Sequence, residues 1–183
     1  SVIPANDHLI IFASDRNEVV GGNYHTSFKI TQGRQEGAVL SDPAGTIIDS
    51  YMLDIANQLD HSRGRASDGD PNWGVFLNPT PGTSNPNPYE EYTTVSIETD
   101  AGNYSGTVNV EITSGDPDAT IYYTLDGTTP TEASAEYTGP IAISNTTVVR
   151  ARAFNPDPLV PPSFIETNTY ILNDFHTIPV VSV

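Results

Sequence analysis

Three oxygen-bearing side chains stand at alternate positions in the first half of the chain: Asp68, Asp70 and Asn72. Carboxylate and amide oxygens at this spacing open the calcium-binding loops of EF-hands. Such a loop also needs glycine at its sixth position and glutamate at its twelfth, where this chain has Trp73 and Pro79. The EF-hand interpretation therefore fails. We favour a solvated loop, and an irregular calcium site is the alternative.

Trp73 and Tyr122 are the aromatic residues whose rings are candidates for stacking on a sugar. Alternation along residues 120–125 turns Ile121, Tyr123 and Leu125 toward a core and Tyr122 toward solvent. The competing interpretation, which we prefer, is that Trp73 and Tyr123 fill hydrophobic cores. Tyr122 is thus the better candidate for contact with a ligand.

The sequence offers no arrangement for catalysis. The histidines are scattered and lack metal-ligand spacing; they are His8, His25, His61 and His176. His61-Ser62-Arg63 has no glycine-flanked nucleophile elbow. With 23 Asp and Glu residues, accidental carboxylate pairs are expected, and no cysteine is present to act as a nucleophile or zinc ligand. We predict that the chain is not an enzyme.

Charge narrows the range of partners. The 183 residues carry a formal net charge of −16, which disfavours phosphate backbones and anionic lipid surfaces. No apolar run is long enough to cross a bilayer. The charge is also uneven, since residues 86–183 hold 13 acidic and only two basic residues. We expect a protein or polysaccharide partner, without nucleic acid or membrane insertion.

The sequence predicts an all-β chain with two sandwich domains of immunoglobulin or fibronectin-III type in tandem. Short apolar or alternating runs recur between clusters of Gly, Pro, Asn and Asp, and 15 prolines disfavour long helices. Val108, Val110 and Ile112 share one face, as do Val149, Ala151 and Ala153, which leaves Arg150 and Arg152 toward solvent. Asp126-Gly127 is typical of a tight hairpin. Predicted strands are 8–13, 27–31, 38–41, 46–51, 74–77, 93–98, 107–112, 120–125, 141–144, 148–154 and 164–172.

Two proline-rich segments are candidate linkers. Thr83–Glu91 has no apolar period, and we take 86–92 as the linker between the two domains. Asn155–Pro162 is either a second linker or an exposed excursion between two strands of one domain.

The first half resembles the bacterial lamin-tail family in the order of its pieces, which are His25–Ile30, Ala38–Ser50, Gly64–Trp73 and Pro79–Asn85. The resemblance implies an immunoglobulin-like sandwich over residues 1–85 with interaction roles and no catalysis. The family's opening strands, with their tryptophan-and-glutamate segment, do not appear before Ser1. The sheet is therefore expected to lack strands or to borrow them, including by exchange between chains.

The second half resembles the chitobiase/β-hexosaminidase C-terminal module, over Ala119–Thr131, Tyr137–Ile143 and Thr147–Ala153. This implies a fibronectin-III-like sandwich over 93–173 that accompanies catalytic domains. Phe175–Val183 resembles the entry into a spore-coat-protein-H-type kinase, so 174–183 is expected to begin a following domain. No glycine-rich loop or catalytic aspartate of a kinase is found here.

These patterns predict non-catalytic structural or interaction modules of a secreted or cell-surface bacterial protein, which space or support a downstream domain. The first residue is serine and the only methionine is Met52, so we expect an excised segment with any export signal upstream. One alternative is a carbohydrate-binding accessory module that uses Tyr122 or Trp73. Another is a regulatory or substrate-positioning arm of a kinase-like enzyme.

Overall fold

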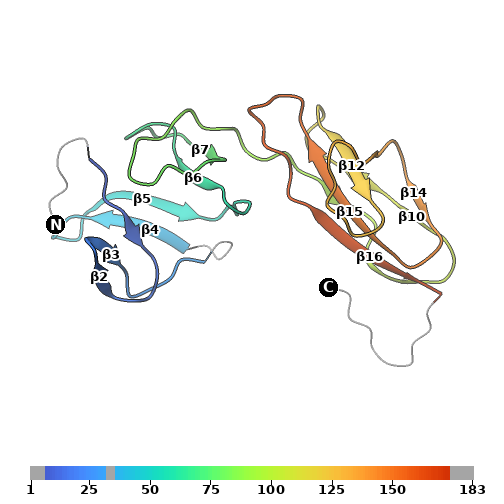
Figure 1. Ribbon diagram of the computed structural model, residues 1–183, viewed down its shortest axis with the longest axis horizontal. Coiled ribbons are helices and arrows are strands. Elements are labelled where there is room, and N and C mark those ends of the chain that lie inside the picture. The colour runs from blue at the N-terminus through green and yellow to red at the C-terminus, as the bar shows by residue number, and fades with distance from the viewer. Residues whose placement is uncertain (1–6, 32–35, 174–183) are drawn as a thin grey trace. The chain divides into compact units, whose positions relative to one another are not determined.

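The computed structural model describes residues 7–31 and 36–173, and every regular element in these ranges is a β-strand (Figure 1). The predicted all-β, sandwich-type fold class is confirmed. The chain forms two compact units, Ser1–Pro88 and Tyr89–Val183, called here the N-terminal and C-terminal units. The expected start of a following domain at 174–183 lies outside the described residues. No helix in the described part has the length and apolar character needed to cross a bilayer.

The N-terminal unit consists of a small three-stranded sheet and two separate hairpins. In the small sheet, β3 lies between β2 and β1 and runs parallel to β1. The Gly21-Gly22 turn joins β2 to β3, and both glycines have positive φ, which lets the chain reverse tightly. The strands are β1 (Ile11–Phe12), β2 (Glu18–Val20), β3 (Asn23–His25), β4 (Glu36–Ser41), β5 (Ile47–Leu53), β6 (Ser62–Arg65) and β7 (Trp73–Phe76).

The N-terminal unit buries few of its apolar side chains. Its only buried residues among those described are Gly74, Val75 and Phe76. Large aliphatic side chains on the β4–β5 hairpin are exposed, for example Val39 at 61% and Ile48 at 65%. Each hairpin has two strands and no third strand among the described residues. Apart from the stacking of Trp73 on Tyr51, the apolar side chains of the β4–β5 hairpin lack a covering layer in the described part of the chain.

The C-terminal unit is a two-layered sandwich (Figure 1). A five-stranded sheet in the order β13-β12-β15-β16-β9 packs against two strand pairs, β10–β14 and β8–β11. Its strands are β8 (Ser96–Ile97), β9 (Gly102–Tyr104), β10 (Val108–Val110), β11 (Ile112–Thr113), β12 (Thr120–Thr124), β13 (Ala135–Glu136), β14 (Ile141–Ile143), β15 (Thr147–Phe154) and β16 (Glu166–Leu172).

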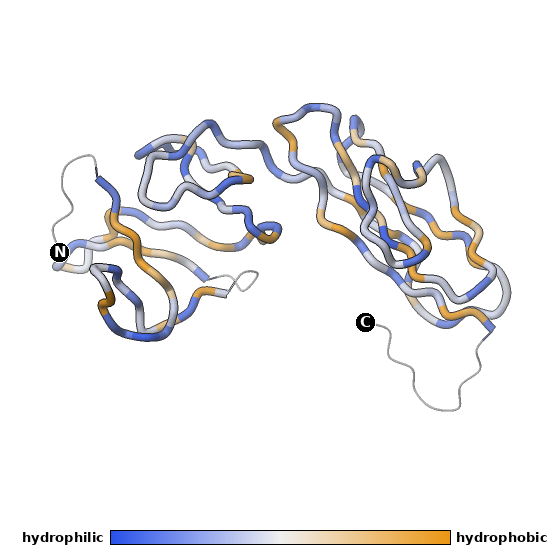
Figure 2. The backbone as a smooth tube through the Cα atoms, in the orientation of Figure 1, coloured by the Kyte–Doolittle hydropathy of each residue, from blue (hydrophilic) through white to orange (hydrophobic). Residues whose placement is uncertain are grey.

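The core of this unit follows the period-two alternation of its strands, which appears as alternating hydropathy along the tube in Figure 2. Val110 and Ile112 are buried in one layer, and they face Val149, Ala151 and Ala153 from β15 in the other. The predicted inward positions on these strands are confirmed. An interior filled at every second residue leaves the intervening side chains to form the outer faces.

The expectations for residues 120–127 are partly wrong. Ile121 is buried and Tyr123 packs against the core, but Leu125 is 42% exposed because β12 ends one residue before it. Gly127 does adopt positive φ. However, the turn there is not a tight hairpin, since the chain runs on through 125–134 before β13 pairs with β12.

The two proline-rich segments have different positions. Asn155–Pro162 is an excursion between β15 and β16 inside the C-terminal unit. The buried Ser163 ends this excursion, because its N–H donates to Ala153 O at 3.0 Å and its Oγ accepts from Ala153 N at 2.9 Å. The boundary between the two units lies at Pro88/Tyr89, within the predicted linker range 86–92.

Candidate functional site

The oxygens of the candidate calcium loop are engaged in local hydrogen bonds. Asp70 Oδ1 accepts from the backbone N–H of Asn72 at 2.8 Å and from its side-chain amide at 2.9 Å. Asp68 Oδ2 accepts from Ser84 Oγ at 2.9 Å, and the guanidinium of Arg65 donates to the carbonyl of Asp70. Within residues 7–31 and 36–173, no group of three or more His, Cys, Asp or Glu side chains is placed to hold a metal ion.

The Asp-Pro turn in this loop recurs along the chain. Four aspartates precede a proline, and the carboxylate of each accepts a hydrogen bond from the backbone N–H of the residue two positions later. This arrangement is an Asx-turn, in which the proline fixes the φ of the residue after the aspartate. The pairs are Asp42–Ala44, Asp70–Asn72, Asp116–Asp118 and Asp157–Leu159. Four of the 23 acidic residues thus shape turns in this way.

Trp73 lies in a cluster of side chains in the N-terminal unit. Its ring stacks on Tyr51 with centroids 3.6 Å apart and planes at 18°, and the Cζ of Arg65 lies 5.1 Å from its centroid. Arg65 is the cross-strand neighbour of Trp73 on the β6–β7 hairpin, and its Nη2 reaches Asp49 Oδ1 at 2.5 Å. Trp73 therefore joins the β6–β7 hairpin to the β4–β5 hairpin.

A groove of about 270 Å³ borders this cluster. Its lining is mainly apolar, with Ile11, Val39 and Leu40 beside Tyr51 and Trp73. The only carboxylate in the lining belongs to Asp49, which is ion-paired with Arg65. The groove thus offers apolar contact and no acid–base pair. Sequence analysis did not single out Tyr51 and Arg65, because nothing in the chain showed which hairpins would meet.

Tyr122 lies on the outer face of the five-stranded sheet, as alternation predicts. It is the cross-strand partner of Arg152 on β15 and of Glu136 on β13. Its ring meets Phe154 edge to face, with centroids 5.7 Å apart, and the Cζ of Arg152 lies 5.4 Å from the centroid of Phe154. Partial burial lowers the pKa of Arg152.

Each arginine of β15 also ties a loop to the sheet. Arg150 Nη1 donates to Gly127 O at 2.9 Å, and Arg152 Nε donates to Ser163 O at 3.0 Å. We call the half-buried set Tyr122, Arg150, Arg152 and Phe154 the aromatic–arginine face. Sequence analysis placed Tyr122 and both arginines outward but missed Phe154, which the same alternation along β15 would have found.

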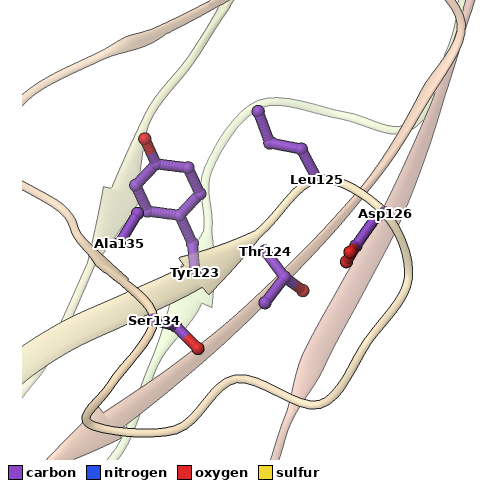
Figure 3. A pocket seen from close by; sticks show the side chains of 6 residues that line it. All are labelled: Tyr123, Thr124, Leu125, Asp126, Ser134 and Ala135. Atoms are coloured by element: carbon purple, nitrogen blue, oxygen red, sulfur yellow. The ribbon is translucent and has the colours of Figure 1, made fainter.

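A hollow of about 390 Å³ on the C-terminal unit lies where β12 ends (Figure 3). Tyr123 and Ala135, a cross-strand pair, line it together with Leu125 and Asp126. The carboxylate of Asp126 accepts from Thr128 Oγ1 at 2.6 Å and from Thr128 N at 3.0 Å, and these bonds lower its pKa. The carboxylate therefore stabilises the turn.

One hydroxyl–imidazole pair occurs in the N-terminal unit. Ser14 Oγ and His25 Nδ1 are 2.8 Å apart, and the His25 ring stacks on Phe12 at 4.9 Å. In the described residues, no carboxylate is recorded against the other ring nitrogen of His25 to orient it as a base, as a catalytic triad requires. The pair therefore fixes β3 to the chain after β1.

Comparison with known families bears on the C-terminal unit. Residues 99–160 match the chitobiase/beta-hexosaminidase C-terminal domain. The predicted resemblance is thus supported over most of this unit, and the matched family is that of an accessory domain and not of a catalytic one. The aromatic–arginine face lies entirely within the matched residues 99–160. No curated protein and no solved structure matches the chain.

Proposed function

We propose that the chain supplies non-catalytic accessory modules to a larger secreted or cell-surface bacterial protein. The observation that carries this is the chitobiase-type match over 99–160, because that family accompanies catalytic domains. In this role the C-terminal unit is a rigid support that spaces or holds a neighbouring domain.

Two features of the C-terminal unit suit a rigid support. Its apolar side chains are used in one interior, with Val110, Val149 and Tyr170 fully buried. Arg150 and Arg152 hold two long connections against the sheet. A close-packed interior with fixed loops transmits position between its ends without bending.

Within the same accessory role, the N-terminal unit is suited to binding a protein partner. Its exposed aliphatic side chains on the β4–β5 hairpin, and the apolar groove beside Trp73, are surfaces that a protein partner can cover. The predicted lamin-tail relationship would give this unit an interaction role, and we propose that role for it.

Replacement of residues 89–173 in the full-length protein tests the support role. An unrelated β-sandwich of similar length should preserve the activity of the neighbouring domain, whereas a flexible Gly/Ser linker of equal residue number should lower it. Equal activity with both replacements, or with the modules deleted, would contradict the proposal.

A second candidate function is carbohydrate binding by the C-terminal unit. The observation that favours it is the outward Tyr122 ring beside Phe154, inside a domain whose family is named for enzymes that act on amino sugars. A glycan array probed with the whole chain tests it. Retention of a glycan by the native chain and its loss with Tyr122→Ala would support the function, and no retention of any glycan would dismiss it.

A further inference from the structure

The N-terminal unit exposes more apolar surface than the C-terminal unit. Among the described residues, fourteen large hydrophobic residues of the N-terminal unit are exposed, by 39% to 89%, against three in the C-terminal unit. At about 25 cal/mol per Å² and about 1.5–3 kcal/mol per buried side chain, these fourteen present roughly 500–900 Å² of apolar surface. A standard interface buries about 800 Å² on each partner, so the unit has enough apolar surface for one.

One side of the β4–β5 hairpin gathers part of this surface (Figure 1). The register places Val39 opposite Ser50 and Gly37 opposite Met52, and alternation turns both pairs away from the side that carries Tyr51. A Cβ added at Gly37 would lie 2.9 Å from Met52 Sδ, so the Met52 side chain lies across this side of the hairpin. Val39 and Met52 are each more than half exposed.

This side of the hairpin carries no charged side chain. The acidic residues of the two strands, Glu36 and Asp49, lie on the side of Tyr51. We call the uncharged set the outer hairpin face, and its members are Gly37, Val39, Ser41, Ile47, Ser50 and Met52. Two copies of a chain with a net charge of −16 repel each other where their acidic surfaces meet. The outer hairpin face can meet a second copy with little repulsion, and it offers no carboxylate to a basic partner.

A two-stranded pair is a sufficient covering layer elsewhere in this protein. In the C-terminal unit, the pair β10–β14 packs against the five-stranded sheet, and its Val108, Val110 and Ile143 are buried. The β4–β5 hairpin is also a two-stranded antiparallel pair with an apolar side. A second copy of the hairpin therefore supplies the kind of layer that the outer hairpin face lacks, since a two-fold axis brings the same patch against itself.

We propose that the N-terminal unit associates with a second copy of itself through the outer hairpin face. The two hairpins pack face to face about a two-fold axis, with Val39, Ile47 and Met52 of each copy at the contact. This proposal rests on the interaction role proposed above for the N-terminal unit and names the partner. The face is only part of a standard interface, so we expect a dissociation constant in the micromolar range and a monomer in dilute solution.

Sedimentation of the whole chain measures this association. A concentration series across the micromolar range should show a single monomer–dimer equilibrium. Raising the salt concentration from about 0.1 M to about 1 M shortens the screening length from about 10 Å to about 3 Å, so the dimer should become at least about threefold tighter as the repulsion between copies is screened. An association that depended on opposite charges would instead weaken with salt.

Substitutions locate the contact. Val39→Glu and Ile47→Glu should each weaken dimerisation by at least about tenfold, because each places two unpaired carboxylates in the apolar contact of a two-fold dimer. Leu159→Glu is the matched control, since Leu159 is also exposed but lies in the C-terminal unit, and it should change the dissociation constant by less than about twofold. The emission of Trp73, the only tryptophan, verifies that the N-terminal unit of each variant is folded.

A spin label tests the same contact without removal of an apolar side chain. The chain has no cysteine, so Ser50→Cys carries a single label on the outer hairpin face. The labelled chain should show dipolar coupling between copies at concentrations where it dimerises, and dilution with unlabelled chain should abolish the coupling. This measurement decides the question if a glutamate variant fails to fold, because absence of coupling in a dimer would overturn the proposed contact.

A chain that stays monomeric at both salt concentrations, or that dimerises equally well with Val39→Glu, would overturn the proposal. Assemblies that keep growing with concentration would overturn a closed two-fold contact. Val39→Glu in the full-length protein separates the proposal from the role on which it rests. Loss of function there with a monomeric native chain would overturn self-association and retain an interaction with another protein. Unchanged function there with a dimeric native chain would support the dimer and overturn the interaction role.

Discussion

Val39 on β4 and Val149 on β15 hold similar positions, each inside a strand and each next to at least one apolar residue. Val149 is completely buried, whereas Val39 is 61% exposed. The difference lies in the second layer and not in the strands. The C-terminal unit supplies β10, β14 and β8–β11 to cover its five-stranded sheet, while the β4–β5 hairpin has only the small β6–β7 hairpin against one face. Strand pattern alone therefore does not ensure a core.

The largest expected effect is that the two units unfold separately. Trp73 is the only tryptophan, so its fluorescence reports the N-terminal unit alone, whereas far-UV circular dichroism reports both. In urea, Trp73 emission should change well before the main dichroism transition. We expect a gap of about 3 kcal/mol or more in unfolding free energy, since each buried aliphatic side chain contributes about 1.5–3 kcal/mol. Coincident transitions would show that the two units share one stability.

A matched pair of substitutions sharpens the comparison at single residues. Val149→Ala should destabilise the C-terminal unit by about 2–3 kcal/mol, because it leaves a cavity in a packed interior. Val39→Ala should change stability by no more than about 0.5 kcal/mol. Urea titrations followed by dichroism and by Trp73 emission measure the two effects. A cost for Val39→Ala as large as that for Val149→Ala would mean that β4 is covered in solution.

The contact between the two N-terminal hairpins should have a smaller effect. Tyr51→Leu removes the ring stacked on Trp73 and should lower the stability of the N-terminal unit by about 1 kcal/mol, with a shift in Trp73 emission. Tyr51→Phe retains an aromatic ring and serves as the control. The dichroism transition of the C-terminal unit should not move in either variant, and any shift in it would contradict the separation of the units.

The smallest expected effect is on the pH dependence of the stability of the C-terminal unit. The hydrogen bond from Asn155, with further bonds from Thr93 and Asp118, holds the pKa of Asp116 below its ordinary value. A carboxyl with a lowered folded-state pKa adds stability above its unfolded value of about 3.9, and that stability is lost as pH falls through the folded-state pKa. Asp116→Asn should therefore reduce the loss of stability of the C-terminal unit between neutral pH and pH of about 3.

Urea midpoints at the two pH values measure this, with Asp118→Asn as the control. Asp118 is exposed, and its backbone N–H rather than its carboxylate takes part in the turn. An equal acid effect in native and Asp116→Asn chains would show that this turn does not couple stability to pH.

Sequence patterns located the C-terminal strands well because each strand there alternates against a buried layer. Val108, Val110, Ile121 and Val149 all point inward as expected. The patterns did worse in the N-terminal unit. The predicted strand 27–31 is absent apart from a bridge between Ser14 and Lys29, and β2, β3 and β6 were not predicted. In the C-terminal unit, the short strands β9 and β13 were not predicted either. Apart from β2, these short strands carry few apolar residues, so pairing with a neighbour defines them.

Prediction of the candidate sites from the sequence was limited in the same way, because their residues come from different strands. Outward placement of Tyr122, Arg150 and Arg152 follows from alternation within each strand. Their juxtaposition depends on the register between β12 and β15, which local sequence does not encode. Trp73 was recognised as a large aromatic residue, but its partners Tyr51 and Arg65 come from elements that meet only in three dimensions.

The edge strand β9 has a consequence for how the protein is made. Residues 102–104 pair in parallel with residues 170–172 at the other end of the unit, and the hydroxyl of Tyr170 donates to Thr99 O at 2.8 Å. During synthesis β9 must wait until nearly the whole unit has left the ribosome, and contacts this distant in sequence form slowly. The parallel pairing that completes this edge of the sheet therefore cannot form in a nascent chain until Leu172 has left the ribosome.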